Sequence, residues 1–189
     1  MARVLVLAAV AIGTALRVYP LHVPYMHPDA EGVPLQALSM IADGTWRPPD
    51  LLYPSAFLYL LRGSYAAAGA WGVAQDRLDL VLTYVRDPFP FLLTARVIAC
   101  VFGIATIAMT ARLGGALGDA WTAGLAALAI ATNVLHVRES HYGTGDVPAT
   151  ALFTAALALA VTFVRTPRRR TLAGAGALAG LAAAFRYPA

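Results

Sequence analysis

The chain has 189 residues, of which 59% are hydrophobic and 13% are charged, whereas about a quarter of the residues in an ordinary soluble domain carry a charge. Together with a mean hydropathy of +0.66, this composition predicts an integral membrane protein and excludes a disordered chain, a collagen-like chain and a nucleic-acid-binding tail. The net charge of +4 is therefore interpreted as a membrane orientation signal. The single cysteine, Cys100, excludes an internal disulfide and a thiolate metal site.

Stretches without charged residues mark the predicted membrane spans, because a charge at the bilayer centre costs roughly 2.5 to 3.5 kcal/mol. We expect an all-α membrane protein with about five transmembrane helices, near residues 4–20, 91–112, 120–137, 147–164 and 171–189. The first stretch has the alternative of a cleaved signal peptide. The residues that follow it, 17–20, do not form a small-residue cleavage site, which favours a membrane anchor.

A long segment, residues 21–90, separates the first two predicted spans and is expected to form an outer loop that carries interfacial helices. Within it, Ala56–Ala74 is long enough to cross the membrane if Arg62 were tolerated there. The positive-inside rule favours an interfacial position, because a crossing would place the Arg165–Arg170 cluster outside. An interfacial position also leaves both predicted outer loops, 21–90 and 138–146, in the same compartment.

The first outer loop begins with His27, Asp29 and Glu31 around Pro28. Titratable groups at alternate positions directly after a span suit a hard-metal site or a general base. The alternative is structural: Asp29 or Glu31 starts the helix that runs to Ala42 and lies near its positive end.

The second outer loop is dense in polar side chains, from His136 to Asp146. A loop between two apolar spans does not need this density for solubility, so the segment is a candidate site. The alternative is an interfacial turn in which Asp146 caps the next helix ahead of Pro148, a favourable residue for a first helical turn.

Three arginines fall near the outer boundary of the predicted spans: Arg17, Arg96 and Arg138. Each taken alone has the alternative role of an anchor whose side chain extends to the membrane surface. Together they would suit an anionic head group, because a guanidinium binds phosphate oxygens as a bidentate fork.

Six features follow one another in an order that resembles a known family. They are a first span, the His27-Pro28-Asp29 loop, the stretch Tyr53–Leu61, a span opening at Leu93–Val97, the loop His136–Tyr142 with Asp146, and the segment Gly180–Tyr187. This order resembles the N-terminal half of the GT-C membrane glycosyltransferases. The closest branch looks like the phospholipid carrier-dependent transferases, which are related to protein O-mannosyltransferases and lipid A aminoarabinose transferases.

The resemblance implies an inverting transfer of a sugar from a polyprenyl-phosphate donor to an acceptor hydroxyl. The site would face the outside, or periplasm, of the cell's inner (plasma) membrane. Asp29 matches the family's first-loop aspartate and Asp146 its second-loop aspartate. The family pattern places a glutamate directly after the first aspartate, whereas here Ala30 intervenes and Glu31 falls one place late.

The resemblance also implies roles for individual residues. The predicted catalytic residues are Asp29, Glu31 and Asp146, with Asp29 as general base or metal-bound activator of the acceptor. Asp29 and Asp146 would hold a divalent metal ion. The predicted substrate-binding residues are His27, Tyr53, Arg96, Arg138 and His141.

Family members continue through further spans, so we expect this chain to be the front part of a larger enzyme that does not catalyse alone. The alternative function is a fragment of a multi-pass transporter or a non-catalytic membrane subunit. A transporter would place ionisable groups at mid-membrane depth, whereas here they gather at the ends of the predicted spans.

Overall fold

The computed structural model describes the chain except for residues 20, 23–27, 51–53, 70–75 and 188–189, and it leaves out the side chains of residues 28–31 and 77. Throughout the described residues the chain forms helices and turns, with no strand. Nine helices follow one another in this part of the chain: α1 (Ala2–Val18), α2 (Pro28–Ala42), α3 (Ala56–Ala68), α4 (Arg77–Arg86), α5 (Phe89–Leu117), α6 (Ala120–Ala131), α7 (Val134–Glu139), α8 (Asp146–Arg165) and α9 (Arg169–Phe185).

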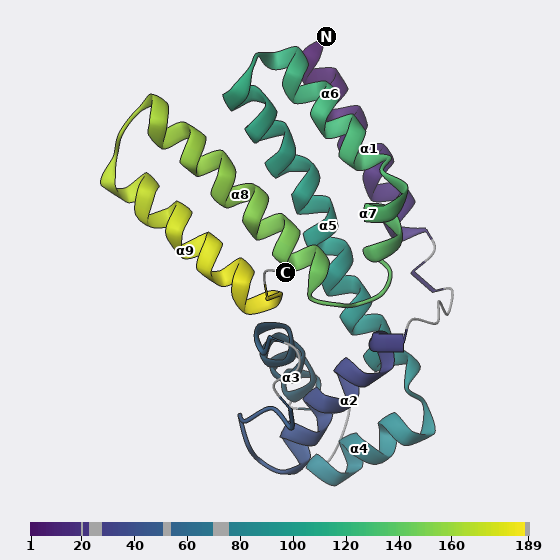
Figure 1. The fold of residues 1–189 in the computed structure, drawn as a ribbon. Helices are drawn as coiled ribbons and strands as arrows, with labels where there is room; N and C mark the ends of the chain where they lie inside the picture. The colour runs from purple at the N-terminus through teal and green to yellow at the C-terminus, as the bar shows by residue number, and fades with distance from the viewer. Residues whose placement is uncertain (20, 23–27, 51–53, 70–75, 188–189) are drawn as a thin grey trace.

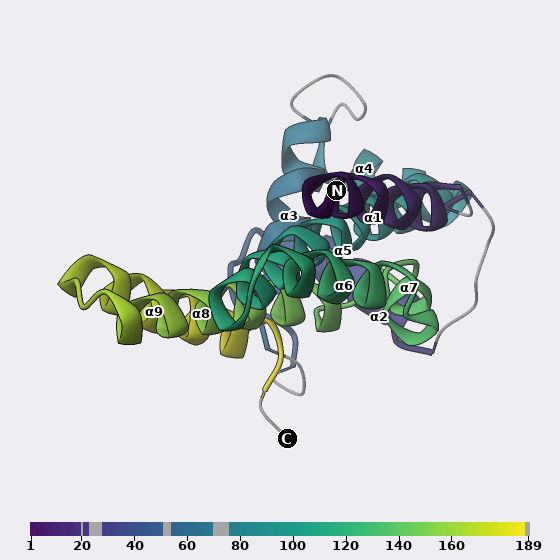
Figure 2. The ribbon, with the colours of Figure 1, turned by 90° about the horizontal axis from the view of Figure 1, so that it is seen from above.

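Five of these helices, α1, α5, α6, α8 and α9, form a bundle in which successive members run in opposite directions (Figure 1). Seen from above, α9, α8, α5 and α6 stand in a row, and α1 lies against α5 and α6 (Figure 2). Small side chains allow the close packing of α1, α5 and α6, whose shared core contains Ala9, Ile107, Ala111, Ala127 and Ala131. Small residues at helix contacts are typical of helices that associate within membranes.

Helices α2, α3 and α4 gather at one end of the bundle, around the start of α5 (Figure 1). Their common core includes Leu38, Leu61, Tyr65 and Phe91, and the Tyr65 hydroxyl donates a hydrogen bond to the Phe91 carbonyl oxygen at 2.9 Å. We call this the outer end, following the predicted orientation. The inner end is the opposite one, where short turns join α5 to α6 and α8 to α9.

Among the described residues, two helices are long and apolar enough to cross a membrane, α5 with 29 residues and α8 with 20. Helices α1 and α9 have 17 residues each and α6 has 12, which is shorter than the roughly 20 residues of a span. The all-helical prediction is confirmed, and α5 and α8 are compatible with a membrane protein. The five-span topology stays a prediction.

The helix of the third predicted span is shorter than expected, because α6 ends at Ala131 and a separate helix, α7, begins at Val134. Asn133 is the reason: its Oδ1 accepts a hydrogen bond from the backbone N–H of His136 at 2.9 Å, which makes it the N-cap of a new helix. The polar segment before α8 therefore begins with the separate helix α7, and the boundary between the third span and the second outer loop stays a prediction.

Helix α3, which covers the first part of the ambiguous Ala56–Ala74 stretch, packs on α2 at the outer end (Figure 1). Its inward face carries Phe57, Leu58, Leu61 and Tyr65, all buried. The helix does not run beside the bundle helices, an arrangement that favours the interfacial interpretation over a crossing.

Candidate functional site

The start of α8 presents Asp146 at the outer end of the bundle. Gly145 occupies the N-cap position, and no side chain caps the helix. The Asp146 carboxylate instead accepts a hydrogen bond from Thr144 Oγ1 (to Oδ2, 3.0 Å) and pairs with Arg186 Nε (to Oδ1, 3.2 Å). The interpretation of Asp146 as the helix cap is therefore wrong, although its charge still lies in the first turn, where the helix dipole favours an anion.

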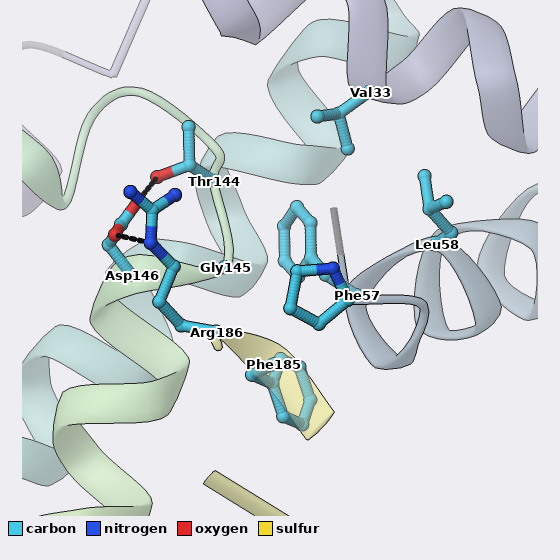
Figure 3. Close-up of a pocket in the computed structure, with 9 residues that line it drawn as sticks. Val33, Phe57, Leu58, Thr144, Gly145, Asp146, Phe185 and Arg186 are labelled. Atoms are coloured by element: carbon cyan, nitrogen blue, oxygen red, sulfur yellow. Dashed lines mark hydrogen bonds and ion pairs between the residues drawn. The ribbon is translucent and has the colours of Figure 1, made fainter. Parts of the chain in front are cut away.

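The Arg186 side chain extends from the end of α9 toward the Asp146 carboxylate (Figure 3). The two side chains are 50% and 38% exposed, respectively. An ion pair this exposed contributes only about 0 to 1 kcal/mol, because water screens it. Arg186 can therefore exchange Asp146 for an anionic ligand at little cost in stability.

A small hollow lies beside this ion pair and is closed by residues of α2, α3 and α9 (Figure 3). Val33, Phe57, Leu58 and Phe185 form its apolar side, and its volume of about 20 Å³ is room for one water molecule. A β-carbon at Gly145 would collide with the Phe185 carbonyl oxygen. Glycine at this position therefore allows α9 to approach the start of α8 and bring Arg186 to Asp146.

A second hollow, an apolar groove of about 510 Å³, runs between α8 and α9 and ends at Arg186 and Tyr187. The rest of its lining consists of Ala149, Thr150, Phe153, Ala179, Ala182 and Ala183. We call it the α8–α9 groove. Arg186 lines both this groove and the hollow beside Asp146, so the ion pair stands where the two meet.

Asp29 and Glu31 lie in the first two turns of α2, where the structure describes the backbone alone. Residue 29 is four positions before Val33, which places both on one face of the helix, and Val33 lines the hollow beside Asp146. Residue 31 is two positions from each of them and lies on a different face. Position 29, and not position 31, therefore shares a face of α2 with Val33. Their predicted catalytic roles stay predictions.

Arg17, in the last turn of α1, is fully buried, with 0% of its surface exposed. Its Nη1 donates to the carbonyl oxygens of Gly13 (2.9 Å) and Ala131 (3.0 Å), and its Nη2 donates to the Ile130 carbonyl oxygen (3.1 Å) and to His136 Nδ1 (2.9 Å). The last carbonyls of α6 have no partner within their own helix, so Arg17 satisfies them while joining α1 to α6 and α7. Its interpretation as an anchor at the membrane surface is wrong.

Two histidines of the second outer loop pack against Arg17, beyond the end of α6. A guanidinium only donates hydrogen bonds, so His136 Nδ1 is the acceptor and Nε2 carries the ring proton; that Nε2 is buried without a partner among the described atoms. Burial, and then the charge of Arg17, lower the pKa of His136 to about 4. His141 Nε2 donates to the Arg17 carbonyl oxygen at 2.9 Å, and burial lowers the pKa of this ring as well. Both rings are neutral at pH 7.

Arg96, predicted to bind substrate, is only 3% exposed on α5. It lies under Gly143, whose φ of +67° is a conformation that favours glycine. A β-carbon at Gly143 would also come within 3.1 Å of the Arg96 backbone nitrogen. The second outer loop is thus pressed onto the α5 backbone at Arg96. Because the Arg96 side chain is buried, its interpretation as a surface anchor is wrong, and its predicted role in substrate binding stays a prediction.

Of the three arginines near the predicted boundary, Arg138 is the exposed one. Its side chain, 57% exposed, pairs with Glu139 at 2.8 Å and has its guanidinium carbon 5.8 Å from the centre of the Tyr142 ring. With His141 and Tyr142 it lines a hollow of about 420 Å³ against Leu16 of α1. An anion could therefore reach Arg138, whereas His141 Nε2 already donates to a backbone carbonyl. His27 and Tyr53 lie outside the described residues, so their predicted roles stay predictions.

The divalent metal ion that the family resemblance implies stays a prediction, because the structure does not describe the side chain of Asp29, one of its two expected ligands. No group of three His, Cys, Asp or Glu side chains that could hold a metal occurs among them. Both Asp146 oxygens are already bonded, and the Arg186 guanidinium at 3.2 Å opposes a cation at the same carboxylate.

Thr144 and Arg186 were not among the residues predicted to form the site. One sequence feature could have indicated Arg186: it is a charged residue directly after the last apolar stretch, in one of the segments that carry the family resemblance. For Thr144 the sequence offers no indication beyond its place in a polar loop. Comparison with protein-family models, curated proteins and solved structures gives no match to the chain.

Proposed function

We propose that the protein acts in the transfer of a sugar from a polyprenyl-phosphate donor to an acceptor hydroxyl at the outer end of the bundle. The observation that carries the proposal is the Asp146–Arg186 ion pair, which stands between the small hollow beside Thr144 and the apolar α8–α9 groove. This junction suits a ligand that joins a long apolar chain to an anionic phosphate and a polar sugar.

The α8–α9 groove offers such a ligand an apolar lining built largely from alanines, with Arg186 at its end. A prenyl chain in this groove would bring its phosphate to the guanidinium, whose N–H donors match phosphate oxygens in a bidentate fork. Because the pair with Asp146 is half-exposed and weak, Arg186 can turn to the phosphate and leave the carboxylate free for the acceptor.

In the proposed reaction the acceptor hydroxyl oxygen attacks the anomeric carbon of the sugar from the face opposite the phosphate. The bond between that carbon and the phosphate oxygen breaks, so the configuration inverts and polyprenyl phosphate leaves. Asp29 takes the hydroxyl proton as general base, and Asp146 accepts a hydrogen bond from the acceptor and orients it. Arg186 stabilises the charge that develops on the leaving phosphate.

The orientation of the proposed site follows from the placement of arginines. The inner end carries Arg3, Arg112 and the Arg165–Arg170 cluster, and the positive-inside rule puts such an end in the cytoplasm. The Asp146 site then faces the outside of the cell's inner membrane, where lipid-linked sugar donors would meet their acceptors.

Binding of farnesyl phosphate, a short prenyl phosphate, to the protein in nanodiscs tests the donor site. Arg186→Gln should weaken binding by at least about tenfold, the effect of losing a charge-assisted hydrogen bond. The matched control Arg165→Gln removes an arginine from the inner end and should leave affinity unchanged. Equal binding of the uncharged farnesol, or an unchanged affinity in Arg186→Gln, would contradict the proposal.

Transfer itself is measured in membranes that contain the protein, as incorporation of radiolabelled sugar from a cell lipid extract. Asp29→Asn should abolish incorporation with expression unchanged, because the amide does not accept the proton. Asp43→Asn, which removes an exposed acid just beyond the end of α2, is the control and should keep wild-type activity. Near wild-type turnover in Asp29→Asn would contradict the assignment of Asp29 as the general base.

A further inference from the structure

The inner end of the bundle holds a hollow that the proposed transfer does not use. It lies between α5, α8 and α9, has a volume of about 400 Å³, and is lined by Met109, Arg112, Ala155, Ala158, Leu159, Thr162 and Leu178. Among the described residues of this lining, Arg112 alone carries a charge. We call this hollow the inner pocket.

The rest of the inner pocket presents alkyl surface. Thr162 does not change this, because its hydroxyl donates to the Ala158 carbonyl oxygen within α8 at 2.7 Å. The small side chains of Ala155 and Ala158 leave the space open between α8 and its neighbours. The pocket therefore offers an apolar chain a continuous lining of alkyl side chains.

The Arg112 guanidinium is available to a ligand. It is exposed, and within the part of the chain that the structure describes, no hydrogen bond or ion pair engages its side chain. Asp119, at the nearby α5–α6 turn, accepts hydrogen bonds from the Thr122 backbone and hydroxyl, and these bonds lower the pKa of its carboxyl group. Asp119 is thus ionised, but it caps α6 and does not pair with Arg112.

Further arginines near the inner pocket add to the positive charge of Arg112. Arg165 at the end of α8 donates to the Leu117 carbonyl oxygen at 3.4 Å, which ties the two inner turns together. Arg168, Arg169 and Arg170 follow at the α8–α9 turn and are exposed. A basic pocket between helices at the cytoplasmic side is the arrangement that recognises anionic lipid head groups.

We propose that the inner pocket binds one anionic phospholipid of the inner leaflet, with its phosphate on Arg112 and one acyl chain along α5 and α8. Charge complementarity and the apolar lining argue for a lipid over a free phosphate, because a free phosphate would leave the apolar walls uncovered. This site lies at the opposite end of the bundle from Asp146, and it does not depend on the proposed sugar transfer.

Native mass spectrometry of the protein released from nanodiscs of phosphatidylglycerol and phosphatidylcholine tests the pocket. The wild-type protein should retain one phosphatidylglycerol in preference to phosphatidylcholine. Arg112→Gln should lower this retention about fivefold, the effect of removing one arginine near an anionic head group. Arg170→Gln, an equal change of charge outside the lining, is the matched control and should change it less than twofold.

A second variant separates the pocket from general attraction to charge. Ala158→Phe keeps every arginine but fills the space, so it should lower retention as Arg112→Gln does, while Arg112→Lys should restore part of it. Added inorganic phosphate should not displace the lipid. Equal losses of phosphatidylglycerol retention in Arg112→Gln and Arg170→Gln would overturn the proposal in favour of diffuse electrostatic binding. Full retention of the lipid in an Ala158→Phe protein of native helicity would overturn it as well.

Discussion

The buried Arg17 shows how one side chain can organise a loop. The hydrogen bonds of its guanidinium join the carbonyl end of α6 to His136 on α7. Its backbone carbonyl oxygen accepts a hydrogen bond from His141 Nε2. Gly103 makes room for it, since a β-carbon there would stand 3.1 Å from Arg17 Nε. The second outer loop, including Arg138, is positioned by these contacts.

This arrangement predicts a loss of stability in acid. The pKa of His136 is about 4 in the folded protein, below the ordinary 6.5, so between these values the unfolded chain binds a proton that the folded protein does not. The free energy of unfolding is therefore unaffected by His136 above pH 6.5 and falls as pH drops from 6.5 toward 4, by a total of order 3 kcal/mol. Thermal unfolding in detergent between pH 7.5 and 4.5 measures it.

His136→Gln should flatten this dependence on pH, leaving the smaller part that His141 contributes with the same sign. His22→Gln, which changes an exposed histidine, should keep the wild-type slope. A slope that is the same in all three proteins would show that His136 is not the group that titrates.

At the scale of elements, the decisive contact is between the start of α8 and the end of α9. Gly145 lets the Phe185 carbonyl oxygen approach, and this approach sets Arg186 opposite Asp146. Phe185 also packs on Phe57 of α3, with ring centres 6.4 Å apart, so the same junction ties the bundle to the helices of the outer end.

Gly145→Ala should therefore force the two helices apart and lower stability by about 1 to 3 kcal/mol, the usual cost of overpacking. Gly176→Ala is the control, since a β-carbon at this position in α9 meets nothing within 4 Å and alanine favours a helix by up to about 1 kcal/mol. Thermal unfolding should show a lower midpoint for Gly145→Ala and an equal or higher midpoint for Gly176→Ala. A higher midpoint for Gly145→Ala than for Gly176→Ala would show that the close approach of Phe185 to Gly145 does not contribute to stability.

At the scale of the whole molecule, the fold brings α2 and the start of α8 to one end (Figure 1). Residue 29 then shares a helix face with Val33, which lines the hollow beside Asp146. A shared site for the two aspartates requires this common end, and it requires α3 to stay out of the bundle.

Cysteine accessibility tests the whole arrangement in cells. In a protein whose buried Cys100 is replaced by alanine, a single cysteine at position 29, 75 or 146 should react with a membrane-impermeant maleimide added outside. A cysteine at position 168 should react only after the membrane is opened, because the positive-inside rule puts this turn in the cytoplasm. Labelling of positions 29 and 146 from opposite sides of the membrane would contradict a site shared by the two aspartates.

Some of the site could be predicted from local sequence, and some could not. Asp146 stood out because polar residues are rare in this chain and cluster before α8. The interpretation of Arg17 and Arg96 as surface anchors was wrong, because an arginine at the end of an apolar stretch looks the same whether it meets lipid or a neighbouring helix. The start of α7 was also missed, since Asn133 lies in a stretch without charge.

The sequence by itself determined that the chain is helical, where the long apolar helices α5 and α8 lie, and which segments carry the polar residues, because these depend on composition and on the spacing of charges along the chain. The tertiary structure decided the rest. It buried Arg17 and Arg96 and it paired Asp146 with Arg186, which lies 40 residues later. Such pairings depend on which small residues let two helices approach, as Gly145 does for the end of α9, and this contact across the chain leaves no periodic signal in the sequence.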